Sequence, residues 1–239
     1  MQKINGGKTA LVLGCKGQDG SLLCKSLINQ GFEVVGLTRN RSTNLANLKS
    51  LKIEQDINLE EGKITDYTLI KQIIESHNPI EIYNLAAQSS VGKSFSSPKE
   101  TIESIIQGTI NILEVSKDIN YEGRLFFAGS SEIFGNTKIK ADLNHKQNPQ
   151  SPYGIAKQTS LNLVKMYREQ YNLSCVTGIL FNHESPFRQK DFVTQKIISE
   201  AILCSKNSNH KLNIGNIEIA RDWGWAEEYV EGMQLITRA

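Results

Sequence analysis

Two side chains with complementary chemistry stand at positions i and i+4 in the stretch Tyr153-Gly-Ile-Ala-Lys157. On a helix this spacing puts the phenol and the ammonium on one face, where the lysine charge favours the phenolate and lowers the pKa of the tyrosine toward the range useful for acid/base work. The spacing alone is weak evidence, because Tyr67-Thr-Leu-Ile-Lys71 repeats it. Since only Tyr153 follows a predicted strand at residues 124–128, this pair is the one expected at the ligand-binding edge of a sheet.

Hydroxyl and carboxyl groups follow that same predicted strand, in the triplet Ser130-Ser131-Glu132. A hydroxyl can hold a substrate oxygen while a carboxylate takes a proton, provided both lie within hydrogen-bond reach of one sugar carbon. The alternative is a serine that caps a helix or turn, with Glu132 in solvent. Position alone does not decide between the two interpretations.

Three glycines, Gly14, Gly17 and Gly20, stand three residues apart between a predicted strand and a predicted helix. Such a turn allows a pyrophosphate to approach the backbone closely, and the helix N-terminus supplies N–H groups and a positive dipole. A purely structural turn is the alternative, but the location directly after the first strand favours dinucleotide binding.

The next strand ends before Arg39 and Arg41, where a dinucleotide's ribose would lie. Because arginine suits a 2′-phosphate, the sequence favours NADP over NAD unless these are solvated loop arginines.

The elements that must position these residues alternate regularly along the chain. Apolar runs predict strands, helical periodicity predicts helices between them, and Asn78-Pro79 punctuates one junction. Strands separated by helices need crossover connections, so the prediction is an α/β fold, a doubly wound parallel sheet covered on both faces. Strands are predicted at residues 9–13, 32–37, 80–85, 124–128, 174–180 and, briefly, 212–214; helices are predicted at 18–30, 66–76, 102–113, 152–171, 193–204 and from about 225.

Composition narrows the class of protein. The 239 residues carry 27 Lys+Arg against 25 Asp+Glu, a net charge of +2 that offers nucleic acid no dominant basic field. The four cysteines are widely spaced without metal-ligand patterns, so neither a metal site nor a disulfide framework is indicated. No signal-peptide core or long apolar stretch occurs, so we expect a cytoplasmic chain that does not enter a membrane.

Together these segments resemble the extended short-chain dehydrogenase/reductases, with their Rossmann fold, and among them the GDP-mannose 4,6-dehydratase family. The resemblance covers about residues 8–236 and is carried most specifically by Asn182-His-Glu-Ser-Pro186, Phe192-Val-Thr194 and Arg221-Asp-Trp-Gly224. It implies an NADP-binding Rossmann domain over residues 8–181 and an incomplete small substrate-binding portion over 182–239 with a helix returning to the core. It also implies a homo-oligomer, either a dimer or a tetramer.

The resemblance further implies a lyase reaction in deoxysugar biosynthesis, converting GDP-mannose to GDP-4-keto-6-deoxymannose with tightly bound NADP. By this resemblance Ser130 binds the hexose O4, Tyr153 takes the O4 proton, Lys157 binds the nicotinamide ribose, and Glu132 removes the C5 proton. The remaining positions carried over are cofactor-binding Gly14, Gly17, Gln18, Asp19, Gly20, Arg39, Arg41, Ile64, Leu85, Ala86, Ala87, Tyr153 and Lys157, and substrate-binding Ser89, Ser130, Asn182, Glu184, Val193, Lys196 and Arg221.

Several positions depart from the family pattern. Lys63-Ile64 stands where the family usually has Asp-Leu at the adenine, Asn40 replaces the second residue of an Arg-Arg pair, and Phe187 replaces the first of another. The family also continues well past the end of this chain. Two alternatives therefore stay open: an inactive relative that retains a dinucleotide-binding core, and a nucleotide-sugar 4-epimerase or 4-keto reductase. Glu132 favours dehydration, because epimerisation requires no base at C5.

Overall fold

The computed structural model describes residues 7–239 and contains a six-stranded, entirely parallel sheet. This confirms the doubly wound Rossmann fold, because the strand order reverses direction at the first strand and the chain builds outward on both sides. Across the sheet the strands are β3 (Ile57–Glu61), β2 (Glu33–Thr38), β1 (Thr9–Leu13), β4 (Glu81–Asn84), β5 (Arg124–Ala128) and β6 (Cys175–Gly178).

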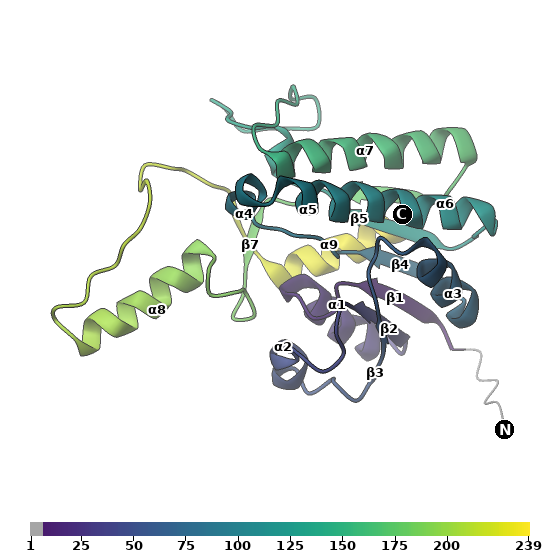
Figure 1. Cartoon of the computed structure of the whole chain (residues 1–239), viewed down its shortest axis with the longest axis horizontal. Coiled ribbons are helices and arrows are strands. Elements are labelled where there is room, and N and C mark those ends of the chain that lie inside the picture. The colour runs from purple at the N-terminus through teal and green to yellow at the C-terminus, as the bar shows by residue number, and fades with distance from the viewer. Residues whose placement is uncertain (1–6) are drawn as a thin grey trace.

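Helices cover both faces of the sheet (Figure 1). The helices α3 (Tyr67–His77), α6 (Gly108–Asp118) and α7 (Pro152–Tyr171) pack on one face, while α1 (Gln18–Asn29), α2 (Ala46–Ser50) and α9 (Ala226–Arg238) pack on the other. Two shorter helices, α4 (Val91–Ser96) and α5 (Pro98–Ile102), lead through a π-helical turn at Glu103–Gln107 into α6. The single long helix predicted over residues 102–113 is thus divided at this turn.

The central strand β1 shows why both faces must be covered. Leu11 and Leu13 point into the core beneath α3, α6 and α7, whereas Ala10 and Val12 point into the core beneath α1 and α9. All four are fully buried. Alternate strand residues therefore feed two separate hydrophobic cores, which explains why the sequence reads as a continuous apolar run.

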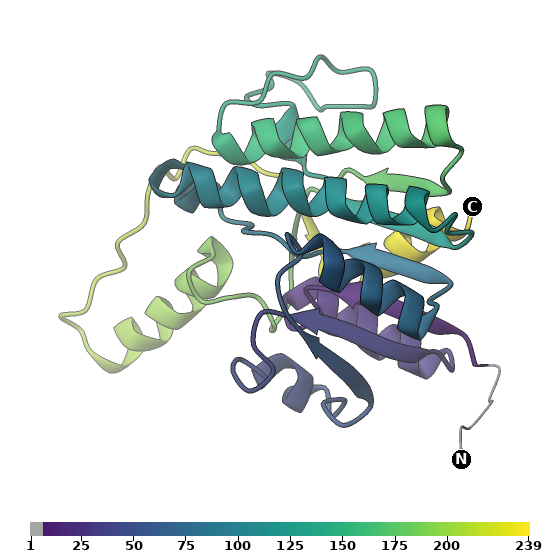
Figure 2. The same cartoon turned by 45° about the vertical axis from the view of Figure 1, so that its right-hand side comes forward.

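A second, two-stranded sheet pairs β7 (Asn182–Glu184) with β8 (Trp223–Trp225) in parallel. Between them the helix α8 (Val193–Lys206) and the stretch after it extend away from the main sheet, as Figures 1 and 2 both show. The strand predicted near residues 212–214 is wrong. Those residues have no regular secondary structure, and β7 pairs with residues 223–225 instead.

Most other predicted elements are confirmed with small shifts at their ends, and α7 covers the predicted residues 152–171. The strand β3 was not predicted, because three of the five residues in its sequence, Ile-Asn-Leu-Glu-Glu, are polar. Within the described residues, no helix has both the length and the apolar character needed to cross a bilayer.

Candidate functional site

The glycine-rich loop has a backbone that side chains would block. Gly14 has a φ of +85°, and a Cβ there would lie 3.0 Å from the backbone of Ala86. A Cβ on Gly20 would lie 2.2 Å from the carbonyl oxygen of Gly14. Gly17 precedes the first residue of α1 and leaves the helix start without a side-chain cap. This open helix N-terminus beneath a close-packed turn fits a dinucleotide pyrophosphate.

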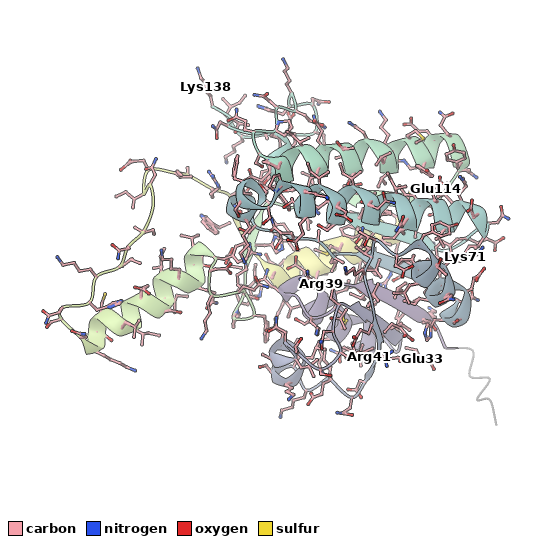
Figure 3. The ribbon with its side chains drawn as sticks, viewed as in Figure 1. Glu33, Arg39, Arg41, Lys71, Glu114 and Lys138 are labelled. Atoms are coloured by element: carbon pink, nitrogen blue, oxygen red, sulfur yellow. The ribbon has the colours of Figure 1, made fainter. Side chains whose placement is uncertain are left out.

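The arginines predicted at the cofactor ribose differ in their surroundings (Figure 3). The Arg39 side chain is 82% exposed and lies 3.7 Å from the Glu100 carboxylate, so it remains free to move. Arg41 instead donates from its guanidinium to Glu60 at 3.0 Å, and from its backbone N–H to Glu61 at 2.8 Å. The structure therefore leaves Arg39 available to a ligand and engages Arg41 with β3.

The catalytic candidates meet at the carboxyl ends of β5 and β6. Ser130 follows β5 by two residues and caps the 3₁₀ turn Ser131–Ile133, because its hydroxyl accepts a hydrogen bond from the backbone N–H of Glu132 at 3.2 Å. Ser151 caps α7 by accepting from Gly154 N–H at 3.0 Å, so Tyr153 lies in the first helical turn. The Ser130 hydroxyl lies close enough to Tyr153 to lower the pKa of the phenol. The structure brings the hydroxyl, the phenol and the neighbouring carboxylate together.

Gly154 makes this convergence possible. A Cβ on Gly154 would lie 2.8 Å from the carbonyl oxygen of Glu132, which is backbone and has no rotamer to change. Only glycine lets the first turn of α7 pack so closely on the 3₁₀ turn Ser131–Ile133. Gly154 therefore sets the separation between the Tyr153 phenol and the 3₁₀ turn that contains Glu132.

Burial controls the titration of the tyrosine and lysine. Burial raises the pKa of Tyr153 to about 12; a hydrogen bond from Ser130 opposes this rise and the charge of Glu132 adds to it. The expected lowering of the Tyr153 pKa by Lys157 is wrong for this arrangement. The Lys157 ammonium donates to the carbonyl of Ala128 at 2.8 Å and lies 5.6 Å from the centre of the tyrosine ring. Burial lowers the pKa of Lys157 to about 8.

The other Tyr/Lys pair has a structural role. Tyr67 on α3 donates its hydroxyl proton to the Asp118 carboxylate on α6 at 2.6 Å. This hydrogen bond raises the pKa of Tyr67, since Asp118 holds the phenol proton. Tyr67 therefore joins two surface helices, whereas Lys71 lies 4.0 Å from the Glu75 carboxylate on its own helix.

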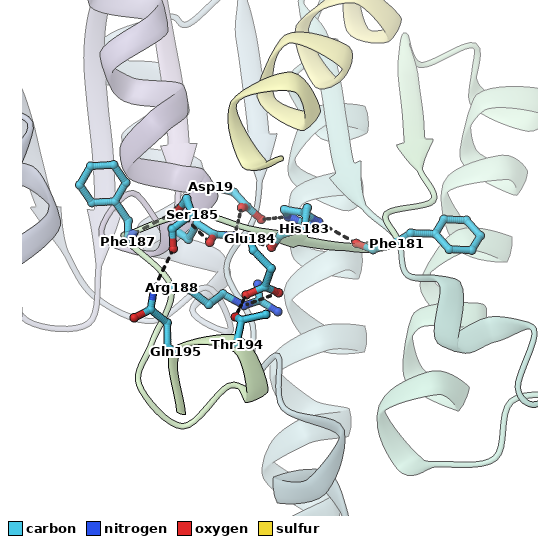
Figure 4. Close-up of polar contacts among 10 residues, drawn as sticks. Asp19, Phe181, His183, Glu184, Ser185, Phe187, Arg188, Thr194 and Gln195 are labelled. Carbon is cyan, nitrogen blue, oxygen red and sulfur yellow. Dashed lines mark hydrogen bonds and ion pairs between the residues drawn. The ribbon is translucent and has the colours of Figure 1, made fainter. Parts of the chain in front are cut away.

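A polar network that the sequence did not predict joins the glycine-rich loop to β7 (Figure 4). His183 Nε2 lies 2.9 Å from the Asp19 carboxylate, and Tyr229 of α9 stacks on the imidazole with ring centroids 4.2 Å apart. Gln18 donates to the carbonyl of His183 at 3.1 Å and accepts from the Ser185 hydroxyl at 2.9 Å. These contacts fix the start of α1 against β7.

The ion pair in this network shifts both of its titratable groups. Burial pushes the pKa of Asp19 upward, but the hydrogen bond and charge of His183 outweigh it and hold the pKa below its usual value. Burial lowers the pKa of His183, and the hydrogen bond and charge of Asp19 outweigh that effect and raise it. The charged pair is therefore the favoured form at mildly acidic pH.

Arg188 is a second residue that the sequence did not single out for the site. Its Nε lies 3.5 Å from the Glu184 carboxylate, which also accepts the Thr194 hydroxyl. The guanidinium stacks 3.9 Å above the Phe192 ring. Its charge reaches Tyr153, where it opposes the rise in pKa. In the sequence, the segment Asn182-His-Glu-Ser-Pro186 was the signal that marked this region as functional. The carboxylates that pair with His183 and Arg188 can be identified only from the structure.

The remaining predicted site residues divide between the sheet edge and the exposed segments. Ala86 and Ala87 line a small cavity that Lys157 and Asn84 also border, and the buried Asn84 side-chain oxygen has no hydrogen-bond partner among residues 7–239. Ile64 is buried against Gly108. By contrast, the structure leaves Ser89, Val193 and Arg221 exposed, with Asn182, Glu184 and Lys196 partly exposed and Leu85 packed at the edge of one core.

The sheet order, the glycine-rich loop and the Ser130/Tyr153/Lys157 group define a Rossmann-fold protein of the extended short-chain dehydrogenase/reductase class. Solved structures with this fold include a UDP-glucose 4-epimerase from Thermotoga maritima, 25% identical with a TM-score of 0.83 over 95% of this chain and 72% of that one. A dTDP-glucose 4,6-dehydratase from Streptomyces venezuelae, solved with NAD, has 21% identity and a TM-score of 0.86 over 97% and 72%.

The chain belongs to the GDP-mannose 4,6-dehydratase family, whose model matches residues 11–239. It is 38% identical to GDP-mannose 4,6 dehydratase 1 of Arabidopsis thaliana, over 96% of this chain and 66% of that protein. The Homo sapiens GDP-mannose 4,6 dehydratase is also 38% identical, over 95% and 64%. The chain thus spans about two thirds of the length of these curated relatives.

Proposed function

We propose that the chain carries the catalytic core of a nucleotide-sugar 4,6-dehydratase that converts GDP-mannose to GDP-4-keto-6-deoxymannose with bound NADP. The observation that carries the proposal is the meeting of Ser130, Tyr153 and Glu132 at one sheet edge. A hydroxyl, a phenol and a carboxylate are the groups required to bind O4, to deprotonate O4 and to deprotonate C5. The family to which the chain belongs indicates GDP-mannose as the nucleotide sugar on which these groups would act.

The residues of the glycine-rich loop fit the cofactor's phosphates, as the blocked Cβ positions and the open start of α1 indicate. Arg39 is the exposed cation that we assign to a 2′-phosphate, and this favours NADP over NAD. Lys157, held near the Tyr153 ring, would bind the nicotinamide ribose. When bound, such a dinucleotide accepts a hydride from C4 of the hexose and later returns it to C6.

The chain's own residues move the protons. Ser130 holds the hexose O4 while Tyr153 accepts the O4 proton. This transfer requires the pKa of Tyr153 to fall below its value in the buried site, as the positive charge of a bound oxidised nicotinamide would favour. Glu132 then removes the C5 proton, which the C4 ketone acidifies, and hydroxide leaves C6 with a proton as water. A proton returned to C5 completes the product, which differs from the substrate by one water.

We assign the two parts of the chain different tasks. Residues 8–181 bind the dinucleotide, and residues 182–239 contribute to holding the sugar nucleotide through Asn182 and Arg221. The donors of an arginine suit a diphosphate. A dimer or tetramer, as the resemblance implies, is part of this proposal and is tested by light scattering of the purified chain.

The direct test is to incubate the purified chain with NADP and GDP-mannose and to analyse the product by mass spectrometry and by absorbance in alkali. The proposal predicts a 4-keto product lighter than GDP-mannose by one water. A GDP-hexose of unchanged mass would instead identify an epimerase. Retained NADP binding without any product would identify a dinucleotide-binding module.

A further inference from the structure

The helix α8 and the stretch that follows it project from the body of the fold (Figures 1 and 2). No residue of α8 is buried, so the hydrophobic cores do not hold this helix. Its first turn is tied to β7 instead, because Thr194 donates its hydroxyl proton to Glu184 and Gln195 donates to the carbonyl of Ser185 at 3.1 Å (Figure 4). Residues 188–222 are therefore attached to β7 and not to the main sheet, and we call them the projecting unit.

One pair of side chains joins the projecting unit to the body. The Lys93 ammonium on α4 donates to the Asp191 carboxylate at 3.0 Å, two residues before α8 begins. In the part of the chain that the structure describes, this is the one hydrogen bond or ion pair between the projecting unit and residues 7–180. The two side chains are 61% and 48% exposed, so water and salt screen their attraction and the pair opens readily.

The segment directly before the projecting unit is held more firmly, on the side of the glycine-rich loop. The Ser185 hydroxyl donates to Gln18 at 2.9 Å in a buried contact, and the Asn47 side chain donates to the carbonyl of Phe187 at 3.2 Å. Breaking a buried hydrogen bond costs more than breaking an exposed ion pair, because it leaves desolvated polar groups without partners. The exposed contact at Asp191 is thus the point at which the unit separates from the body first.

The Lys93–Asp191 pair lies between the two parts of the proposed site. On the side of α4, Val91 packs in one hydrophobic cluster with Tyr153. From the projecting unit, the charge of Arg188 reaches the same tyrosine. The predicted substrate residues Val193 and Lys196 also belong to this unit, whereas the catalytic group lies at the ends of β5 and β6. A sugar nucleotide bound by both parts requires them to be docked during the reaction and separated during entry and exit.

We propose that Lys93 and Asp191 form a latch that docks the projecting unit beside Tyr153 and opens to admit the sugar nucleotide and release its product. The inference rests on the proposed function and adds a step at which the chain controls access to that site. Both residues are positioning residues, and neither takes part in the chemistry. Because the latch requires only opposite charges, the reversed pair Lys93→Glu with Asp191→Lys should close it as well.

Amide hydrogen exchange of the free chain, followed by mass spectrometry, tests the latch without any ligand. We expect peptides from residues 188–196 to exchange about threefold faster in Lys93→Gln, because the loss of an exposed ion pair shifts an opening equilibrium by a few-fold. The reversed pair should restore the wild-type rate. The control Lys99→Gln, an exposed lysine on the neighbouring helix α5, should leave the rate unchanged.

Stopped-flow fluorescence of N-methylanthraniloyl-GDP tests whether the latch controls access. If the latch gates a site that is closed both before and after binding, Lys93→Gln raises the association and dissociation rates alike. We expect each rate to rise about threefold, with the dissociation constant unchanged within about twofold, and we expect the reversed pair to restore both rates. Lys99→Gln is again the control.

The other outcomes contradict the proposal. Unchanged exchange in Lys93→Gln would show that the ion pair does not hold the projecting unit, and faster dissociation alone would show that Lys93 contacts the ligand directly. Failure of the reversed pair to restore the rates would assign the effect to one residue and not to the pair. If the wild-type chain does not bind the GDP probe, the inference and the proposed function fail together. If it binds the probe but does not convert GDP-mannose, the proposed function alone fails.

Discussion

At the scale of single residues, the proposed dehydration requires Glu132 to act as a base and not as a structural side chain. Its charge already reaches the Tyr153 hydroxyl, so it lies close to the reacting edge. Its backbone is fixed twice, by the Ser130 hydroxyl and by the close approach of Gly154. The role of the Glu132 carboxylate can therefore be tested by a substitution that removes its charge and leaves these backbone contacts in place.

Glu132→Gln should reduce formation of the dehydrated product by roughly 10²–10⁴-fold, because the amide cannot accept the C5 proton. NADP affinity should stay unchanged, and a single turnover should still produce the absorbance of reduced cofactor, since oxidation at C4 uses Tyr153. The measurement is a stopped-flow trace at the reduced-cofactor band beside product mass. Loss of cofactor binding in this variant would show that Glu132 is structural.

The His183–Asp19 pair predicts how the folded state responds to pH. The pKa of His183 is raised in the folded state, so its contribution is complete below the unfolded value of 6.5 and is lost as the pH rises through the folded pKa. The pKa of Asp19 is lowered, so its contribution is complete above 3.8 and is lost as the pH falls through the folded pKa. The pair therefore stabilises the fold most between these two values.

His183→Gln should lower the free energy of unfolding by about 1–3 kcal/mol in that window, with a smaller difference at alkaline pH. Urea unfolding of wild type and variant at both pH values measures this difference. His145→Gln serves as the control, because His145 packs edge-on against the Phe134 ring. A His183→Gln effect that is the same at both pH values would contradict the assigned ion pair.

At the scale of elements, the contact between α7 and the 3₁₀ turn Ser131–Ile133 sets the catalytic geometry. Gly154→Ala should lower turnover by roughly 10²-fold, because the new Cβ would lie 2.8 Å from the Glu132 carbonyl and push the helix away. Gly232→Ala on α9 is the matched control, because a Cβ at that position would meet no atom within 4 Å beyond its chain neighbours and the backbone of its own helix. Steady-state kinetics would compare the two, and equal activities would show that the separation of α7 from this turn is unimportant.

The strands also show which parts of the fold a local sequence pattern can predict and which it cannot. Strands such as β1 and β5 are buried on both faces, so their apolar runs identify them directly. The strands β7 and β8 have three residues each and are stabilised by a partner far away in the sequence, so no local pattern marks them. For the same reason the Tyr153/Lys157 pair could be predicted, whereas His183 becomes visible as a partner only once Asp19 is placed beside it.

At the scale of the whole molecule, α9 ties its last turn to the central strand β4 of the main sheet. Arg238 donates to the Glu81 carboxylate at 2.7 and 2.9 Å, and the Glu81 side chain is only 4% exposed. Tyr83 donates to the same carboxylate at 2.8 Å. A nearly buried acid on β4 therefore depends on a residue that follows it by more than half the chain.

Arg238→Leu should lower the free energy of unfolding by about 2–4 kcal/mol, because it leaves a buried carboxylate without its cation. The control Lys165→Leu removes an exposed partner of Glu169, at 3.9 Å, and should cost less than about 1 kcal/mol. Urea denaturation compares the two variants. Equal effects would mean that Glu81 finds compensation elsewhere.

The decisive measurement is the position of deuterium in product made from GDP-mannose in heavy water. If Glu132 removes the C5 proton and the hydride from C4 returns to C6, nuclear magnetic resonance should find one solvent deuterium at C5 and none at C6. A product with deuterium at C6, or with the original hydrogen retained at C5, would contradict the account.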